Sequence, residues 1–340
     1  MGSAISNAAE HNPIGFVLNP LAALGIDQFK HLEEANAQEQ ALADLLSSSG
    51  DSFPGSGYHP ANRKSWMESI GPNRLRFHQV VWPGTHDSAT NGIGNLMTRP
   101  FAECQTLSVY DQLSLGCRVL DVRVREDRTV CHGILSSYHV DVVLDDLKRF
   151  LAETTSEVVI LEIRTEFDQQ DPPDFARYLV DKLGDHLIPQ DEQVFNRTIA
   201  ELLPRRVICV WKPRQSPAPN PGDLLWSGGY LRDDWIDTDM PKTKFDSNLD
   251  KLSQNPPVSE RKYFYRVENT VTPTTSSVSS LTVEPVTRRI HRFARLFISR
   301  AVATGNGSKL QVLSTDFIDE DFVDACAGFS MARIERNPGT

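Results

Sequence analysis

The chain has 340 residues, 39% of them hydrophobic and 24% charged, which is the composition of a folded globular protein and excludes a disordered chain. Its formal net charge of -10 argues against nucleic acid as a partner, because a protein that follows a phosphate backbone needs a cationic surface. No run of about eighteen apolar residues occurs, so the sequence predicts no membrane-spanning helix.

The N-terminus and the cysteines indicate where the protein works. No basic segment precedes an uninterrupted apolar run, so we expect no secretory signal peptide. The five cysteines are scattered without C-x-x-C spacing, which favours reduced thiols in a cytoplasmic protein and disfavours a zinc site. Residues 1–6 fit the motif for N-myristoylation at Gly2, a motif short enough to occur by chance, and acylation there adds peripheral membrane binding.

Residues 1–64 differ from the rest of the chain in composition. They are rich in Ala, Asn, Ser and Gly, and residues 47–57 have the composition of a linker. One helix is predicted over 27–46, with apolar positions too sparse for a core element. We therefore expect an N-terminal extension that is partly helical or flexible and dispensable for folding, then a barrel domain over 65–332 and a C-terminal tail over 333–340. An acidic interaction scaffold is an alternative role for the extension.

From residue 77 onward, short runs of Val, Ile and Leu alternate with amphipathic stretches. The apolar runs predict buried parallel strands at 77–82, 118–124, 158–164, 206–211, 263–267 and 310–316. Helices are predicted between them, among them 141–153 and 174–186. This alternation within one domain predicts an α/β fold of the (β/α) barrel type. A doubly wound sheet is the alternative fold, but no Gly-rich nucleotide-binding motif follows any of these strands.

Polar side chains follow the ends of these strands. In a barrel, the chemistry takes place where strands end and the next loops begin, so these groups are expected to converge on one rim. They are His86 and Asp87 after the first strand, Arg123 in the second, His132 after a short turn, Arg164 and Glu166 at the third, and Asp316 at the last.

Two histidines beside carboxylates, with an arginine between them, suit the cleavage of a phosphodiester by an internal hydroxyl. One imidazole takes the proton of the nucleophile, the other protonates the leaving oxygen, and the guanidinium holds the phosphoryl oxygens. Taken singly, each residue has an ordinary structural explanation, such as a helix cap for Asp87 or a buried ion pair for Arg123. Their occurrence together on successive strand ends favours a site.

Three motifs carry a resemblance to a known family. Pro-Gly-Thr-His-Asp-Ser at 83–88, Gly-Cys-Arg-Val-Leu-Asp-Val-Arg-Val at 116–124 and Val-Cys-His-Gly at 130–133 resemble the X domain of phosphatidylinositol-specific phospholipase C. The likeness covers roughly residues 65–332 and is greatest to plant members of the single-domain branch, through segments such as Arg-Val-Glu-Asn-Thr-Val-Thr-Pro at 266–273. It implies a phospholipase C-like phosphodiesterase on an irregular (β/α)8 TIM barrel.

The resemblance also implies a reaction and a role for each residue. The inositol 2-hydroxyl attacks phosphorus, diacylglycerol leaves, and a cyclic inositol phosphate remains. His86 matches the general base with Asp316 orienting it, His132 matches the general acid with Asp87 as its partner, and Arg123 matches the phosphate ligand. The residues that match the inositol-binding side of the family site are Arg164, Glu166, Lys212, Asp233 and Trp235, the last in place of a tyrosine.

Calcium binds at this rim in the multidomain eukaryotic enzymes of the same superfamily. The resemblance aligns Arg123 with an aspartate ligand of that calcium and Arg164 with a glutamate ligand. A guanidinium holds two phosphoryl oxygens in a bidentate fork and so brings the positive charge that calcium otherwise supplies. We therefore expect a metal-independent phosphodiesterase that needs no cofactor.

A catalytically silent module that binds lipid or inositol phosphate on the same barrel is the alternative class of protein. The proton-transfer groups disfavour it, because binding alone needs cations and not a base and an acid. The expected partner is a phospholipid substrate at a membrane surface. Residues 287–300 place Arg288, Arg289, Arg292 and Arg295 opposite apolar residues. This pattern predicts either a helix that contacts anionic lipid or, as we favour, a barrel helix whose apolar stripe faces the core.

Overall fold

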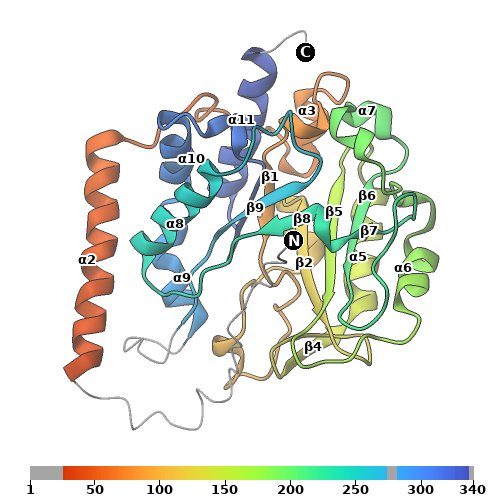
Figure 1. The fold of residues 1–340 in the computed structure, drawn as a ribbon, viewed down its shortest axis with the longest axis horizontal. Helices are drawn as coiled ribbons and strands as arrows, with labels where there is room; N and C mark the ends of the chain where they lie inside the picture. Colours follow the sequence, from red (N-terminus) through yellow and green to blue (C-terminus); the bar gives the residue numbers. More distant parts are fainter. Residues whose placement is uncertain (1–25, 274–281, 337–340) are drawn as a thin grey trace, which may run out of the picture.

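The computed structural model describes residues 26–273 and 282–336. Eight parallel strands curl into an open barrel in the order β7-β6-β5-β2-β1-β10-β9-β8, with helices packed on the outside (Figure 1). The predicted α/β barrel is thereby confirmed. The strands are β1 Trp82–Thr85, β2 Val119–Val124, β5 Val159–Thr165, β6 Val207–Lys212, β7 Trp226–Ser227, β8 Leu231–Asp233, β9 Phe264–Asn269 and β10 Val312–Thr315.

The barrel stays open between β7 and β8, which are not paired in the described part of the chain. Only the 3-10 turn Gly228–Tyr230 joins these two strands. Two parallel neighbours need a crossover of a dozen or more residues, so such a short connection cannot bring them into register. The irregularity of the barrel therefore has a local cause in the chain.

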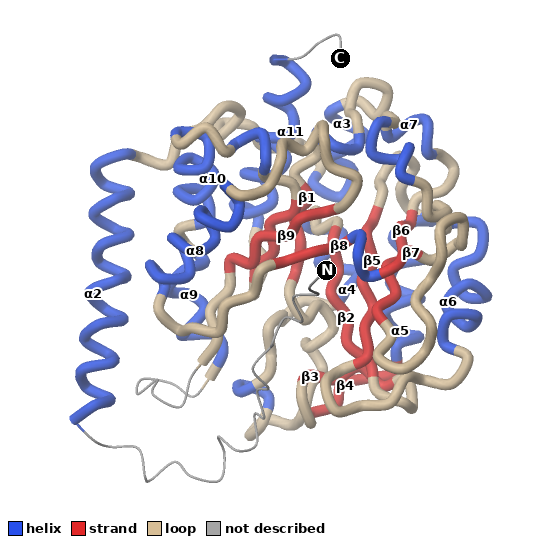
Figure 2. The backbone as a smooth tube through the Cα atoms, in the orientation of Figure 1, coloured by secondary structure: helices blue, strands red, loops and turns tan. Residues whose placement is uncertain are grey.

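An antiparallel hairpin, β3 Thr129–His132 and β4 Leu135–His139, extends from β2 at the carboxyl end of the barrel (Figure 2). None of the described helices has the length and apolar character needed to cross a membrane. The α-helices are α2 Ile26–Ser49, α3 Trp66–Ile70, α4 Val109–Leu115, α5 Val140–Ala152, α6 Phe175–Leu183, α7 Ile199–Leu202, α8 Pro241–Ser253, α9 Val283–His291, α10 Ala294–Ala303 and α11 Glu320–Arg336.

Two expected elements differ from the structure. The strand predicted at 77–82 is a 3-10 turn, Phe77–Gln79, followed by β1, because β1 pairs with β10 only from Trp82 onward. The helix predicted at 287–300 is divided into α9 and α10, because the backbone leaves the helical conformation at Phe293. The spacing of apolar residues in the sequence does not by itself distinguish one amphipathic helix from two successive helices that share an apolar face.

The helix α2 lies along the outside of α8 at one edge of the molecule (Figure 1). Leu42 is fully buried in this contact region, and the sparse apolar face expected from the sequence is supplemented by polar contacts. His31 Nε2 lies 2.7 Å from Asp239 Oδ2, and Gln38 Oε1 accepts a hydrogen bond of 3.0 Å from the backbone of Thr243. The helix is thus attached to the barrel through its polar side chains.

Residues 50–64 are packed more tightly than α2, against α11. Gly55 approaches Gly328 so closely that a Cβ on Gly55 would lie 2.0 Å from the Gly328 carbonyl oxygen, and Phe53 packs edge-on against Phe329 at 5.9 Å. The Nε of Arg63 pairs with the buried Asp324 at 2.7 Å. The structure therefore divides the expected extension into a peripheral helix and a segment that is part of the core.

This division predicts two different truncation results. We expect deletion of residues 1–49 to leave a folded barrel, so the predicted dispensability is retained for this part only. Deletion of residues 1–64 leaves the carboxylate of Asp324 without Arg63, at a cost of about 1–3 kcal/mol, and also removes the Gly55 contact. Thermal unfolding of the two truncated chains and the full chain measures this. Equal Tm values for all three would show that the whole extension is dispensable.

Candidate active site

The inner face of the barrel changes from apolar to charged along its length. At the amino-terminal end the lumen is filled by aromatic rings, with Phe77 4.8 Å from Trp82 and 5.5 Å from Phe264 between ring centroids. Further along, alternate residues on the strands turn charged side chains inward. These are Asp121 and Arg123 on β2, Glu162 and Arg164 on β5, Lys212 on β6, Asp233 on β8, and Arg266 and Glu268 on β9.

His86 lies directly after β1 and is held in one orientation. Its Nδ1 donates a hydrogen bond of 2.9 Å to Asp316 Oδ1, and Asp316 Oδ2 accepts one of 2.9 Å from Thr287 on α9. The side-chain amide of Gln105 donates to the carbonyl of His86 at 3.1 Å and so fixes the backbone of the loop. The sequence analysis placed His86 and Asp316 together; the supporting Thr287 and Gln105 were missed, because nothing in their sequence context signals the contact.

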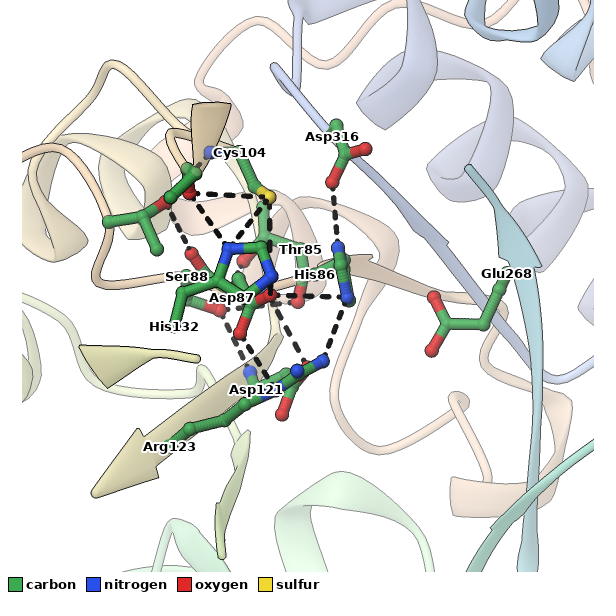
Figure 3. Close-up of polar contacts among 12 residues, drawn as sticks. Thr85, His86, Asp87, Ser88, Cys104, Asp121, Arg123, His132, Glu268 and Asp316 are labelled. Atoms are coloured by element: carbon green, nitrogen blue, oxygen red, sulfur yellow. Dashed lines mark hydrogen bonds and ion pairs between the residues drawn. The ribbon is translucent and has the colours of Figure 1, made fainter. Parts of the chain in front are cut away.

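Asp87 lies between the two histidines (Figure 3). Its Oδ2 is 3.3 Å from His86 Nε2 and 3.4 Å from His132 Nε2, and its Oδ1 is 2.8 Å from Arg123 Nε. The backbone of Asp87 has φ 43°, a left-handed conformation that costs energy for a non-glycine residue and is found at functional sites. This conformation directs the carboxylate toward all three groups at once.

The two imidazoles differ in one neighbour, the guanidinium of Arg123. His132 Nδ1 lies 2.9 Å from the carbonyl oxygen of Ala102 and its Nε2 lies 3.4 Å from Asp87 Oδ2, so both of its nitrogens face acceptors. His86 also faces acceptors, Asp316 at Nδ1 and Asp87 at Nε2, but its Nε2 lies 2.9 Å from Arg123 Nη2 as well and accepts a hydrogen bond from this donor when it carries no proton. Of the two rings, His86 is thus the one with a donor at its Nε2.

Charge acts on His86 in two directions. Burial lowers its pKa, but the carboxylates of Asp87 and Asp316 outweigh burial and Arg123, and together they raise the pKa of His86 to about 9. The contact with Arg123, in contrast, belongs to the neutral ring. The carboxylates decide the direction of the shift, and the neutral ring held by Arg123 is the form that can accept a proton.

This shift predicts a rising pH profile. We expect kcat/KM to increase as His86 loses its proton toward pH of about 9. The variant Asp316→Asn lacks one of the two carboxylates that raise the pKa of His86. We therefore expect its kcat/KM to rise at lower pH and to reach a lower maximum. Profiles on a soluble inositol phosphate ester measure both effects, with Asp319→Asn as a control near the site. An unchanged midpoint in Asp316→Asn would contradict the role of this carboxylate.

The residues expected on the inositol side line the same rim. Arg164 Nε lies 3.6 Å from Asp121, Lys212 Nζ lies 2.7 Å from Glu162, and Arg266 holds Asp233 at 2.9 Å. Each of these three predicted side chains is thus held by an oppositely charged partner and remains partly exposed.

Two of the predicted substrate-binding residues make contacts within the site itself. Glu166 accepts a hydrogen bond of 3.3 Å from the backbone of Gly133 and lies 3.7 Å from Arg123, so it lies beside the residue predicted to bind phosphate. The indole of Trp235 stacks on His86 with ring centroids 5.5 Å apart, and Lys244 Nζ lies 3.9 Å from the centre of the indole. Sequence reasoning missed Lys244, which is buried under the loop that carries Trp235.

One group of side chains has the spacing of a metal site. The ligand atoms of His86, Asp87 and Cys104 lie within 4.8 Å of one another. Burial holds the pKa of the Cys104 thiol well above its usual value, so it is a poor thiolate ligand. Arg123 contacts both His86 and Asp87 and brings a positive charge into the space that a cation would occupy. The donor set therefore does not suit a divalent metal ion.

Comparison with known proteins agrees with this geometry. Residues 82–212 match the family model for the X domain of phosphatidylinositol-specific phospholipase C. A 1-phosphatidylinositol phosphodiesterase of Listeria monocytogenes is 32% identical over 115 residues, 33% of this chain and 36% of that protein. A variant-surface-glycoprotein phospholipase C of Trypanosoma cruzi is 25% identical over 181 residues, 42% of this chain and 46% of that protein. The matched part therefore spans less than half the length of these two relatives.

Solved structures extend the likeness in fold. The phosphatidylinositol-specific phospholipase C of Listeria monocytogenes superposes with a TM-score of 0.63 at 18% identity, covering 79% of this chain and 99% of that one. A variant of the Staphylococcus aureus enzyme gives 0.60 at 14% identity, covering 80% and 99%. The fold and the rim of paired histidines define a phospholipase C-like barrel. Residues 82–212 are thus similar in sequence to the X domain of phosphatidylinositol-specific phospholipase C. The greater likeness to plant members stays a prediction.

Proposed function

We propose that the chain is a phosphodiesterase of the phospholipase C type that cleaves an inositol phospholipid to diacylglycerol and a cyclic inositol phosphate. The observation that carries the proposal is the contrast between the two imidazoles on either side of Asp87: both face this carboxylate, but His86 Nε2 also faces the Arg123 donor. A binding module has no need of this contrast. The match of residues 82–212 to the X-domain family model supports the same reaction.

The contacts allow each proton to be followed. The substrate phosphate takes the place of His86 as partner of the Arg123 fork, which frees His86 Nε2. His86 removes the proton of the inositol 2-hydroxyl as its oxygen forms a bond to phosphorus. The bond from phosphorus to the glycerol oxygen breaks, and His132 Nε2 protonates that oxygen. His86 then holds a proton and His132 does not, which is the state needed for water to open the cyclic product by the reverse exchange.

We also propose that this reaction needs no metal ion. Every carboxylate that suggests a calcium site has a cationic partner within the described residues: Asp87 has Arg123, Asp121 has Arg123 and Arg164, and Glu162 has Lys212 and Arg266. A calcium ion would have to compete with these fixed charges. Arg123 supplies the positive charge at the phosphate instead.

The rim offers a surface for contact with lipid. Leu96 and Met97 are 87% and 84% exposed in the loop after β1, and Ile134 at the tip of the β3–β4 hairpin is 45% exposed. The two segments are joined by a hydrogen bond of 2.9 Å from the Gly94 N–H to the Ser136 carbonyl. Large apolar side chains exposed together beside a charged site are typical of a membrane-contacting surface, and they support a phospholipid partner.

The alternative lipid contact, through 287–300, has less support. Its apolar side chains Ile290, Phe293 and Phe297 are buried, and two of its arginines pair with Glu39 on α2. This arrangement is the barrel helix that we favoured from the sequence. Gly2 lies outside the described residues, so acylation and the cytoplasmic location stay predictions.

The test of the proposal is product formation. Purified protein is incubated with phosphatidylinositol vesicles without added metal, and phosphorus NMR follows the appearance of a cyclic inositol phosphate. We expect product from the natural chain and from His186→Ala, a half-buried histidine outside the site, and none from His86→Ala. Absence of product at high protein concentration, with vesicles still bound, would favour the silent binding module.

A further inference from the structure

Glu268 is a buried carboxylate that the reaction described above does not use. It lies at the carboxyl end of β9, on the same face as Arg266 two residues before it, and its register partner on β10 is Ser314. Figure 3 shows its carboxylate directed toward His86 from the side opposite Asp87 and His132. Glu268 is only 4% exposed.

The two oxygens of this carboxylate differ in their contacts. Oε1 is 2.6 Å from the Nε of Arg266, whereas Oε2 has no hydrogen-bond partner among the described residues. A buried carboxylate oxygen without a hydrogen-bond donor destabilises the folded protein, because it loses its hydrogen bonds to water and forms none within the protein. Burial accordingly raises the pKa of Glu268 against the opposing effect of Arg266.

The neighbouring buried carboxylates differ from Glu268 in their ion pairs. Asp121 Oδ1 and Glu162 Oε1 also lack a hydrogen-bond partner among the described residues, but each lies beside a cation, Arg164 Nε at 3.6 Å and Lys212 Nζ at 2.7 Å. Their other oxygens pair with Arg123 and with Arg266. Within residues 26–273 and 282–336, Glu268 pairs with Arg266 alone, and Arg266 is shared with two other carboxylates.

A purely structural role for Glu268 is already fulfilled by Oε1. We propose that Oε2 is a specificity-determining contact that accepts a hydrogen bond from a hydroxyl of the substrate ring and excludes a phosphate group at that ring position. This inference rests on the proposed function for the nature of the ring. A hydroxyl satisfies the orphaned acceptor, while a phosphate brings negative charge against a buried carboxylate. Sites built to bind a hydroxyl in this way discriminate strongly against a ligand that lacks the donor.

A substrate reaches Oε2 only after neighbouring side chains move. That oxygen is sealed from solvent in this structure, and Trp235, stacked on His86, is partly exposed. Lys244, whose ammonium lies beside this indole, is close enough to Glu268 to be stabilised by its charge. A ring that enters against His86 displaces the indole, and its hydroxyl then meets a carboxylate with a cation nearby.

The experiment compares Glu268→Gln with Glu260→Gln, a matched change at an exposed position before β9. Calorimetric titration measures the binding of inositol 1-phosphate and of inositol bisphosphates that carry a second phosphate at each other ring position. We expect Glu268→Gln to bind inositol 1-phosphate about ten-fold more weakly, since a hydrogen bond to a charged acceptor is lost. We also expect it to discriminate less against one of the bisphosphates, an effect that a structural role would not produce. Glu260→Gln should match the natural chain in both.

Unchanged affinity and discrimination in Glu268→Gln would overturn the inference. If the Tm shows that Glu268→Gln does not fold, Glu268→Asp is used instead, because it retains the charge. We expect Glu268→Asp to bind inositol 1-phosphate more weakly and still to discriminate against the bisphosphate. Cleavage assays separate this inference from the proposed function. Turnover by the natural chain with no effect of Glu268→Gln on KM refutes only the role of Glu268. Binding that depends on Glu268 without any turnover refutes only the phosphodiesterase, and failure to bind inositol 1-phosphate refutes the role of Glu268.

Discussion

We expect His86→Ala and His132→Ala each to lower kcat by about two to four orders of magnitude, the usual contribution of a general base or a general acid. Both side chains lie at the open rim, so their removal leaves the barrel folded, and Tm measurements with His186→Ala as a control check this. The two variants should differ in one respect. A nitrophenol leaving group needs no protonation, so a nitrophenyl ester of inositol phosphate should partly restore the rate of His132→Ala and not that of His86→Ala.

The structural basis for this difference is the environment of the two rings. His132 lies beside the Ala102 carbonyl and Asp87, and within the described residues no hydrogen bond or ion pair joins it to Arg123. His86 faces Arg123 and is oriented by Asp316. Rescue of His86→Ala by the good leaving group would reverse the two roles. Near-normal activity of His132→Ala on a substrate with an alcohol leaving group would show that His132 is not the general acid.

The second large effect concerns Arg123. We expect Arg123→Lys to lower kcat/KM by about two to three orders of magnitude, comparable to the loss of a donor to a developing oxyanion. Lysine keeps the charge but cannot contact Asp87 and His86 through two different nitrogens, as Nε and Nη2 of Arg123 do at 2.8 and 2.9 Å. Arg177→Lys, at an exposed position on α6, is the matched control.

The same preparation tests whether a metal ion takes part. We expect activity on a soluble substrate to survive excess chelator, because Arg123 supplies the positive charge at the phosphate. A soluble substrate is needed, since calcium also changes how an acidic protein meets anionic lipid. Loss of activity with the chelator and its recovery on adding calcium would show that the cation, and not Arg123, neutralises the phosphate.

The phosphate side of the site could be predicted from short motifs. His86 and Asp87 follow an apolar run, and Arg123 ends the next one. Parallel strands of a barrel end at the same rim, so polar residues at successive strand ends are brought together by the regular repeat of the fold. Asp316 could be added because it ends the last strand, which is the neighbour of the first in a closed order. The chain order of strands and helices thus predicted the barrel and the group of polar residues at its rim.

The inositol side depended on contacts that no local pattern records. Trp235, in the loop after β8, stacks on His86 after β1, and Thr287 on α9 donates a hydrogen bond to Asp316 after β10. Glu268 lies in one of the segments that resemble the family, but the sequence does not show that its Oε2 lacks a hydrogen-bond partner. That follows from the structure, in which three carboxylates share Arg266. The sequence by itself determined which residues stand at strand ends. Only the tertiary structure decided how their charges are paired, because pairing depends on distances between residues far apart in the chain.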